Sequence, residues 1–303
     1  MFSRRHPFLF FSLIMSAITG TVIVVLVVAL VLGSSSGTFD YGEKVGVVEV
    51  NGVIVDARSI LEQLEQLRKD ERVKSLVVRI DSPGGAVGPA QEIYREIQKT
   101  RLEKKVIASL GTVAASGGYY IAAAADGIIA SPGTVTGSIG VLMAFTDYRD
   151  LLSKIGLQPV VIKSGAYKDM GSGTREMTEA ERDVLTGLTH QIHEQFVRDV
   201  AAGRKMDPET VRGVADGRIF TGETFQQMGF IDRSGNYADA VAWAAELGGI
   251  TGAVSTLSLE KKPYSFLDYI AGTVLKQTLQ RWLTPSLFPG YLYRPGGGFA
   301  PVG

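Results

Sequence analysis

The sequence contains no cysteine, and only three of its residues are histidines: His6, His190 and His193. Without cysteine the chain can form neither a disulfide framework nor a thiolate nucleophile, which excludes cysteine catalysis. The absence of thiols is compatible with an oxidising compartment. Because so few histidines make a histidine-rich metal centre hard to build, we predict neither a metal site nor a cofactor.

A surplus of charge of either sign is also absent. The 303 residues include 31 basic and 31 acidic side chains, and the formal net charge is zero at pH 7. Proteins that bind nucleic acid present a basic patch or tail, and no long basic run occurs here. We therefore exclude nucleic acid as a partner. The length allows one large domain or two modest ones.

One long uncharged segment lies near the N-terminus, where residues 8–33 carry no charged side chain over 26 positions. A membrane-spanning helix needs roughly 20 apolar residues, whereas the apolar region of a cleaved signal peptide has about 7 to 15. We predict a transmembrane anchor, although "GSSSG" behind it leaves a cleavage site open. Arg4 and Arg5 precede the segment, so the positive-inside rule places residues 1–7 in the cytoplasm. The prediction is a single-pass protein of the bacterial inner membrane with its main domain on the periplasmic side.

Beyond a polar linker at residues 34–43, the hydrophobic pattern alternates between strand and helix. Repeated strand–helix units with short turns are typical of an α/β domain with a largely parallel sheet, which we assign to residues 44–255. The predicted strands are a hairpin pair at 44–55 around Asn51-Gly52 and single strands at 75–81, 105–111, 126–132, 138–145 and 158–165. The predicted helices are at 57–73, 89–103, 119–125, 148–157 and 178–204, and the last begins with a capping-box pattern of Thr178 and Glu181. Residues 207–232 are predicted to form a short helix, a strand and another helix.

Residues 256–303 have a different character. The segment 264–283 has the spacing of an amphipathic helix, and the remainder is rich in proline, glycine and aromatic residues. We predict a packing arm or tail. The alternative is a surface that meets a neighbouring subunit or the membrane.

The stretch "GTVAASGGYYIAAAAD" (111–126) surrounds Ser116 with small residues, which let another backbone come close. Serine is a weak nucleophile that needs a base within hydrogen-bond reach and donors for the oxyanion. A histidine base is disfavoured, because His6 lies across the membrane from Ser116 and the other two histidines lie mid-helix. The G-x-S-x-G motif of the α/β-hydrolases is missing as well.

A neutral lysine is the other base that can serve a serine, provided that it is desolvated. Lys168 lies in "VVIKSGAYKDMGSG", a Gly/Ser-rich turn behind an apolar strand, and Lys163 is its local rival. Spacing alone does not separate the two. In "DSPGG" (81–85), Gly84 and Gly85 follow a buried strand and precede a helix, where backbone N–H groups favour anionic oxygen.

Taken together, "RIDSPGG", "AASGGYYIAAAAD", "SPGTVTGSIGV", "SGAYKDMGS" and "REMT", in this order, resemble the signal peptide peptidase A (protease IV) family in its short single-domain form. The resemblance covers roughly residues 45–250. It implies a serine peptidase with a Ser/Lys dyad. It also implies a ClpP/crotonase-like fold of repeated β-β-α units and an N-terminal membrane anchor.

Carried over by motif, the resemblance makes Ser116 the nucleophile, Lys168 the general base and Ser138, in "TGSIG", the serine that holds the lysine in place. The "PGG" turn becomes the oxyanion element. Gly85 is the first choice of donor there, Gly84 its neighbour, and Gly117 a less certain second donor. The family further implies a dome-shaped homo-oligomer in which Ser and Lys come from adjacent subunits, and substrates such as cleaved signal peptides. After the lysine, "GSGTREMT" has Gly-Thr where relatives often have Pro-Phe, which affects the rim of the site.

Three other functions stay open. A ClpP-class membrane protease that clips membrane-scaffold proteins would share the dyad and differ in substrate. A crotonase-type acyl-CoA enzyme would also use a paired-glycine oxyanion hole, but an exported domain lacks CoA and such enzymes usually use glutamate. A catalytically silent membrane scaffold would not be acylated at Ser116.

Overall fold

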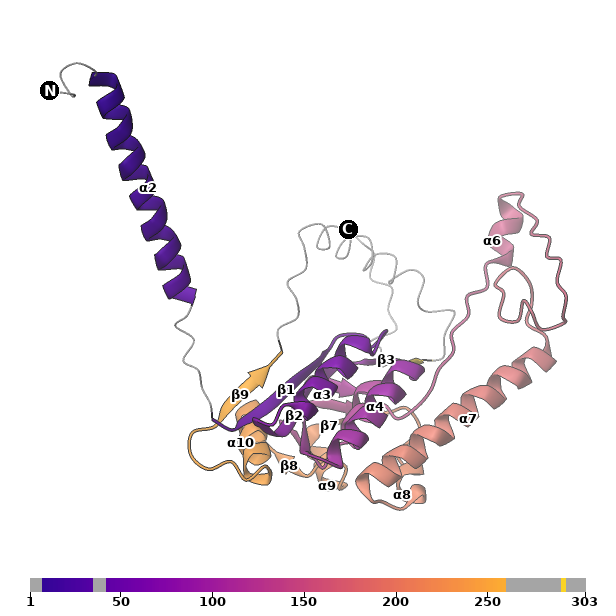
Figure 1. The fold of residues 1–303 in the computed structure, drawn as a ribbon. Helices are drawn as coiled ribbons and strands as arrows, with labels where there is room; N and C mark the ends of the chain where they lie inside the picture. The colour runs from indigo at the N-terminus through magenta and orange to yellow at the C-terminus, as the bar shows by residue number, and fades with distance from the viewer. Residues whose placement is uncertain (1–6, 35–41, 260–289, 293–303) are drawn as a thin grey trace. The chain divides into compact units, whose positions relative to one another are not determined.

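The computed structural model describes residues 7–34, 42–259 and 290–292 (Figure 1). The chain divides into two compact units, Met1–Gly42 and Glu43–Gly303. In the first unit, helix α2 (Pro7–Ser34) covers the segment predicted to be an anchor. Across the described residues, no helix qualifies as long and apolar enough to cross a membrane. The anchor therefore stays a prediction.

The second unit is built on an eight-stranded sheet in the order β7-β6-β4-β2-β1-β9, with β5 paired to β4 and β8 paired to β5. Its pairs are parallel except for β6 with β7. A separate small sheet joins β3 and β10 in antiparallel fashion. The predicted α/β class with a largely parallel sheet is therefore confirmed. The strands are β1 (Lys44–Asn51), β2 (Val73–Ser82), β3 (Gly84–Ala86), β4 (Lys105–Ala115), β5 (Gly127–Ala130), β6 (Val135–Gly137), β7 (Ile219–Thr221), β8 (Arg233–Ser234), β9 (Ser255–Ser258) and β10 (Gly290–Leu292).

Helices cover both faces of the sheet, as a parallel sheet requires. On one face, α3, α4, α5 and α7 contribute to the larger hydrophobic core. On the other face, α10 packs Ala240 and Ala244 against Val45, Val77 and Ile107 of the strands. The helices of this unit are α3 (Arg58–Lys69), α4 (Val87–Arg101), α5 (Gly117–Ala123), α6 (Arg149–Lys154), α7 (Glu179–Arg204), α8 (Pro208–Arg212), α9 (Gly222–Gln227) and α10 (Tyr237–Leu247).

Most of the long predicted elements are found within a few residues of their expected bounds. The helices expected at 57–73, 89–103 and 178–204 are α3, α4 and α7, and the strands expected at 75–81 and 105–111 are β2 and β4. Helix α7 begins with the predicted capping box. The Thr178 side chain accepts from the Glu181 N–H, and the Glu181 carboxylate accepts from the Thr178 N–H.

The predicted hairpin at 44–55 is wrong. Residues 44–51 form the single strand β1, whose two edges are taken by the parallel strands β2 and β9. Strand β2 pairs along the whole of β1 and β9 along Lys44–Val47, and the chain after Asn51 continues toward β3 rather than back along β1. Gly52 instead turns the chain with a φ of 70°, and Ile54 makes a parallel bridge to Gly85.

Strand β9 begins at Ser255 and belongs to the sheet, so the predicted domain boundary at residue 255 falls inside a strand.

The strands predicted at 138–145 and 158–165 are also wrong. Residues 140–178, which we call the arm, leave the sheet after β6 and contain α6, which lies apart from the strands in Figure 1. Within the arm the apolar side chains of Val160 and Ile162 are 86% and 97% exposed. Their alternation is typical of a strand, but none of the strands that the structure describes pairs with this segment. The helix predicted at 264–283 lies outside the described residues.

Helix α7 packs its C-terminal half against α5 so closely that only glycine fits at the contact. A Cβ added to Gly203 would lie 2.1 Å from the carbonyl oxygen of Ala123. We expect Gly203→Ala to lower the free energy of unfolding by about 1–3 kcal/mol, the usual cost of overpacking. Chemical denaturation measures the effect.

Gly187→Ala is the matched control, because Gly187 is on the same helix and an added Cβ would meet nothing within 4 Å. That variant should be neutral or more stable by up to about 1 kcal/mol, since alanine favours the helix. Equal effects of the two substitutions would contradict the packing that we describe.

Candidate active site

Ser116 lies in the turn between β4 and α5, where it is the N-cap residue of the helix. Its backbone has φ 54° and ψ −119°, a strained conformation for a residue other than glycine. The Ser116 N–H donates to the carbonyl of Gly137 at 2.8 Å, and its carbonyl accepts from the Tyr120 N–H at 2.9 Å. The turn is therefore held from the neighbouring strand and from its own helix, and the residue is only 1% exposed.

The helix behind Ser116 is anchored by two buried tyrosines. The Tyr119 hydroxyl donates to the Phe230 carbonyl at 2.9 Å, and the Tyr120 hydroxyl donates to the Asp199 carboxylate on α7. Burial raises the pKa of the Tyr119 hydroxyl far above its usual value, so the group stays neutral. Such fixed donors keep α5, and with it Ser116, in one position.

The small residues around Ser116 bring neighbouring backbone close. A Cβ added to Gly118 would lie 2.7 Å from the carbonyl oxygen of Ser82. Ser82 ends β2, directly before the "PGG" turn. The absence of a side chain at Gly118 therefore allows the end of β2 to lie against the first turn of α5.

Ser138 lies beside Ser116 at the end of the adjacent strand. Strands β4 and β6 pair in parallel with Ala115 opposite Gly137, so each serine follows a paired position. Ser138 has φ 50° and is 7% exposed. Among the non-glycine residues that the structure describes, only these two serines and the helix-capping Lys205 have positive φ. Both strand ends are thus bent in the same unusual way.

The two glycines of the "PGG" turn differ in what their N–H groups can do. The Gly84 N–H donates to the Ser82 hydroxyl at 3.1 Å. On the side facing Ile54, the Gly84 carbonyl accepts from the Ile54 N–H, and the Ala86 N–H donates to the Ile54 carbonyl. Because backbone groups alternate along a strand, the N–H of Gly85 points to the opposite edge of β3. The Gly85 N–H therefore points to the edge of β3 that faces away from Ile54, whereas the Gly84 N–H is bound to Ser82.

This second edge of β3 pairs with a strand from the same chain. β10 pairs antiparallel with β3, with Tyr291 opposite Gly85 and Leu292 opposite Gly84. It also contacts α5, the helix that begins after Ser116. The edge thus pairs with an extended segment of this chain, the same geometry by which proteins bind peptides by strand addition. Nothing in the sequence pattern indicated this pairing.

Lys168 is not part of this group within one chain. It lies in the arm with an exposed side chain, and the described residues include no hydrogen bond from its amine to Ser116 or Ser138. Lys163, the rival, donates to the Asp169 carboxylate at 2.5 Å and to the Ala166 carbonyl at 2.9 Å. Its ammonium is therefore held in an ion pair next to Lys168.

Gly117, the predicted second oxyanion donor, is the first residue of α5. Its N–H has no acceptor inside the helix.

An ion-pair cluster fixes the loop that carries Lys168. The Arg175 guanidinium donates to Asp169 through Nη2 at 2.7 Å and Nε at 2.8 Å. It also donates to the Glu181 carboxylate through Nη1 at 2.9 Å and through Nη2. Glu181 is 3% exposed and belongs to the capping box of α7. Asp169 lies in the motif "SGAYKDMGS" and Arg175 in "REMT", but neither motif by itself predicts this ion-pair cluster.

This cluster should stabilise the arm only while its carboxyl groups are ionised. Hydrogen bonds from Arg175, and then from Lys163, hold the pKa of Asp169 well below its usual value. Arg175 and the Thr178 N–H lower the pKa of Glu181 to about 2. Both folded-state values lie below the unfolded ones, so the contribution is present above about pH 4 and is lost as the pH falls toward about 2.

We therefore expect Arg175→Gln to lower the melting temperature at pH 7, and this difference from the wild type to shrink on acidification below about pH 4. Thermal melts across this pH range measure it. Arg198→Gln, which removes an exposed arginine from α7, should stay close to the wild type throughout. A difference for Arg175→Gln that persists unchanged down to about pH 2 would contradict the cluster's role.

Comparisons with known proteins agree with this geometry. Residues 98–251 match peptidase family S49, and residues 48–135 match Clp protease. A Synechocystis protein named as the protease slr0021 is 43% identical over 69% of this chain and 76% of its own length. An Enterococcus faecium protein named as signal peptide peptidase SppA is 36% identical over 66% of this chain and 62% of its own length.

The relationship extends beyond bacteria. The Arabidopsis thaliana protein named serine protease SPPA, chloroplastic, is 33% identical over 75% of this chain, although the aligned part covers 34% of the plant protein. The S49 match includes the turns of Ser116 and Ser138 and the whole arm, and the Clp match includes the β3 edge. The chain therefore belongs to peptidase family S49 and is an SppA-like serine peptidase.

Proposed function

We propose that this serine peptidase is anchored in the bacterial inner membrane and degrades cleaved signal peptides on the periplasmic side, using Ser116 and Lys168 as its dyad. The observation that carries the proposal is the arrangement at the end of β4. There the strained turn of Ser116 lies against the end of β2, from which the β3 edge continues, and that edge already pairs with an extended strand.

The substrate binds in this proposal as a strand on β3, in the place that β10 takes. Neutral Lys168 removes the proton of the Ser116 hydroxyl as Ser116 attacks the peptide carbonyl. The N–H groups of Gly85 and Gly117 stabilise the oxyanion. Lys168 then protonates the leaving amine, and a water deprotonated by the same lysine releases the acyl group. The Ser138 hydroxyl, beside Ser116, accepts a hydrogen bond from Lys168 and orients it.

Lys168 reaches the serine from a second copy of the chain. In one chain it lies on the arm, whose apolar side chains include Leu151, Val160 and Ile162 at 59%, 86% and 97% exposure. Soluble surfaces rarely leave so much apolar area uncovered unless a partner covers it. A homo-oligomer in which each arm packs on the neighbouring subunit would cover these side chains. It would also remove Lys168 from water, as a lysine base requires.

The substrate class follows from the anchor and from the relatives. Residues 8–33 carry no charge, and an anchor there would hold the peptidase at the bilayer, where cleaved signal peptides remain. Their apolar region of about 7 to 15 residues suits strand addition beside a site built of small and apolar residues. The Enterococcus faecium relative is named as a signal peptide peptidase, which supports the same substrates here.

The dyad and its sharing are tested together with Ser116→Ala and Lys168→Ala on a fluorogenic peptide with leucine or alanine before the scissile bond. Each variant alone should lose at least about 10³-fold in kcat/KM, because serine and base act as a unit. Mixing the two variants under conditions that exchange subunits should restore part of the activity.

Lys163→Ala is the control, since it removes a neighbouring lysine that is held by Asp169. It should retain far more activity than Lys168→Ala. Full activity of Lys168→Ala would refute the assignment of the base. Two inactive variants that stay assembled but do not complement each other would place the dyad within one chain.

The occupation of the β3 edge gives a separate test. If substrate and β10 use the same edge, a chain that ends after Leu259 should show a lower KM for the peptide than the full chain. Tyr291→Pro in the full chain removes one N–H opposite Gly85 and should have the same effect with the tail retained. A KM that is unchanged in both variants, with assembly intact by size-exclusion chromatography, would show that peptides bind elsewhere.

A further inference from the structure

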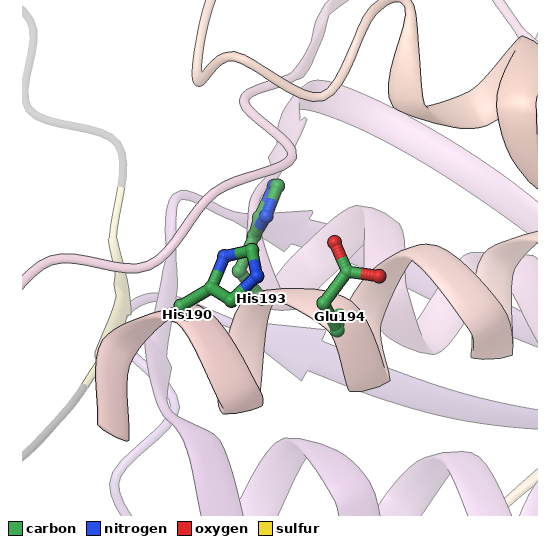
Figure 2. A group of neighbouring side chains, drawn as sticks. All are labelled: His190, His193 and Glu194. Atoms are coloured by element: carbon green, nitrogen blue, oxygen red, sulfur yellow. The ribbon is translucent and has the colours of Figure 1, made fainter. Parts of the chain in front are cut away.

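Helix α7 carries a cluster of three potential metal ligands in its middle, a part of the chain to which the proposed peptidase mechanism gives no role. His190, His193 and Glu194 rise from one side of the helix (Figure 2). Each offers one ligand atom, and these atoms lie within 4.8 Å of one another. The spacings of three and four residues place such side chains next to one another on a helix.

The orientation of His193 is set by a backbone carbonyl. Its Nε2 lies 2.7 Å from the Ala215 carbonyl oxygen. Because a carbonyl oxygen can only accept, Nε2 carries the proton, and in the neutral ring the lone pair is on Nδ1. Metal-binding histidines almost always donate their second ring nitrogen to such an acceptor, which holds the ring in position. The far side of the His193 ring is thus already arranged as in a metal ligand.

Glu194 is oriented in a comparable way by Arg212 from α8. Its Oε2 accepts from Arg212 Nη2 at 2.7 Å, which leaves Oε1 for another partner. The positive charge of Arg212 disfavours a nearby cation, but Arg212 also pairs with Glu209, which offsets part of that charge.

The two histidines of the cluster face a cavity of about 580 Å³ between α7 and the start of the arm. Both histidines line this cavity together with Met143 and Phe145 of the arm and Asp216. An ion at the histidines would therefore have one side open to water or to a group held in the cavity. It would also lie where the arm, which carries Lys168, leaves the sheet.

We propose that His190, His193 Nδ1 and Glu194 form a binding site for a divalent transition-metal cation of the Zn²⁺ type. Two imidazoles and one carboxylate are a set that zinc accepts, with a fourth position left to water. Magnesium and calcium prefer all-oxygen sites. Because the ion would join three side chains of α7 that two other segments orient, through Ala215 and Arg212, it would also stabilise this part of the fold.

The test uses the full chain, purified without a histidine tag, stripped with EDTA and titrated with Zn²⁺ in a calorimeter. We expect one ion per chain and a higher melting temperature with Zn²⁺ than with Mg²⁺ at the same concentration. His190→Gln should weaken Zn²⁺ binding at least tenfold, since it removes one of three ligands. Neither measurement depends on peptidase activity.

Asp183→Asn, an exposed acidic residue near the start of the same helix, is the control and should bind Zn²⁺ like the wild type. Glu194→Gln provides the second variant. It keeps an oxygen for Arg212 but should weaken binding as His190→Gln does. Substoichiometric binding by the wild type, or equal affinity in the wild type and both ligand variants, would overturn the proposal.

Discussion

Strand β4 pairs with three different strands, and the geometry of the site depends on this branching. Along one edge it pairs with β2. Along the other edge its first part pairs with β5, and its last residues, Val113–Ala115, pair with β6. The sheet therefore divides beside β4, and Ser116 follows where the division ends. Because the strands are parallel, their carboxyl ends meet at one edge of the sheet. This brings Ser116, Ser138 and the turn before Gly85 together.

Helix α7 connects this edge to the rest of the molecule. Its C-terminal half fixes α5 through the bond from Tyr120 to Asp199 and the close contact at Gly203. Its first turn holds the arm through Glu181 and Arg175. Its middle carries the cluster of His190, His193 and Glu194. One long helix thus supports the serine, anchors the loop that carries Lys168 and holds the proposed metal ligands.

The parts of the fold that the sequence predicted well are those decided by local pattern. The long amphipathic helices and the apolar strands β2 and β4 follow from periodicity, and the capping box of Thr178 and Glu181 marks the start of α7. The hairpin prediction at 44–55 failed because the chain after β1 turns to β3, and the strand predicted at 158–165 does not pair with any described strand. An alternating apolar segment forms a strand only where a partner edge exists, and edges are set by the whole sheet. Ser116 and Gly85 were singled out from the residues around them and Ser138 by resemblance, whereas the cluster around Arg175 and the pairing of β10 were not predicted.

The sequence by itself determined the class of the protein. The absence of cysteine, the small residues around Ser116 and the order of five short motifs indicated a serine peptidase on an α/β sheet. Only the tertiary structure decided which groups meet. It placed Ser116 beside Ser138, turned the N–H of Gly85 to an edge that accepts a strand, and left Lys168 on an exposed arm. The physical reason is that hydrogen-bond direction and burial depend on partners distant in the chain, which local sequence patterns do not specify.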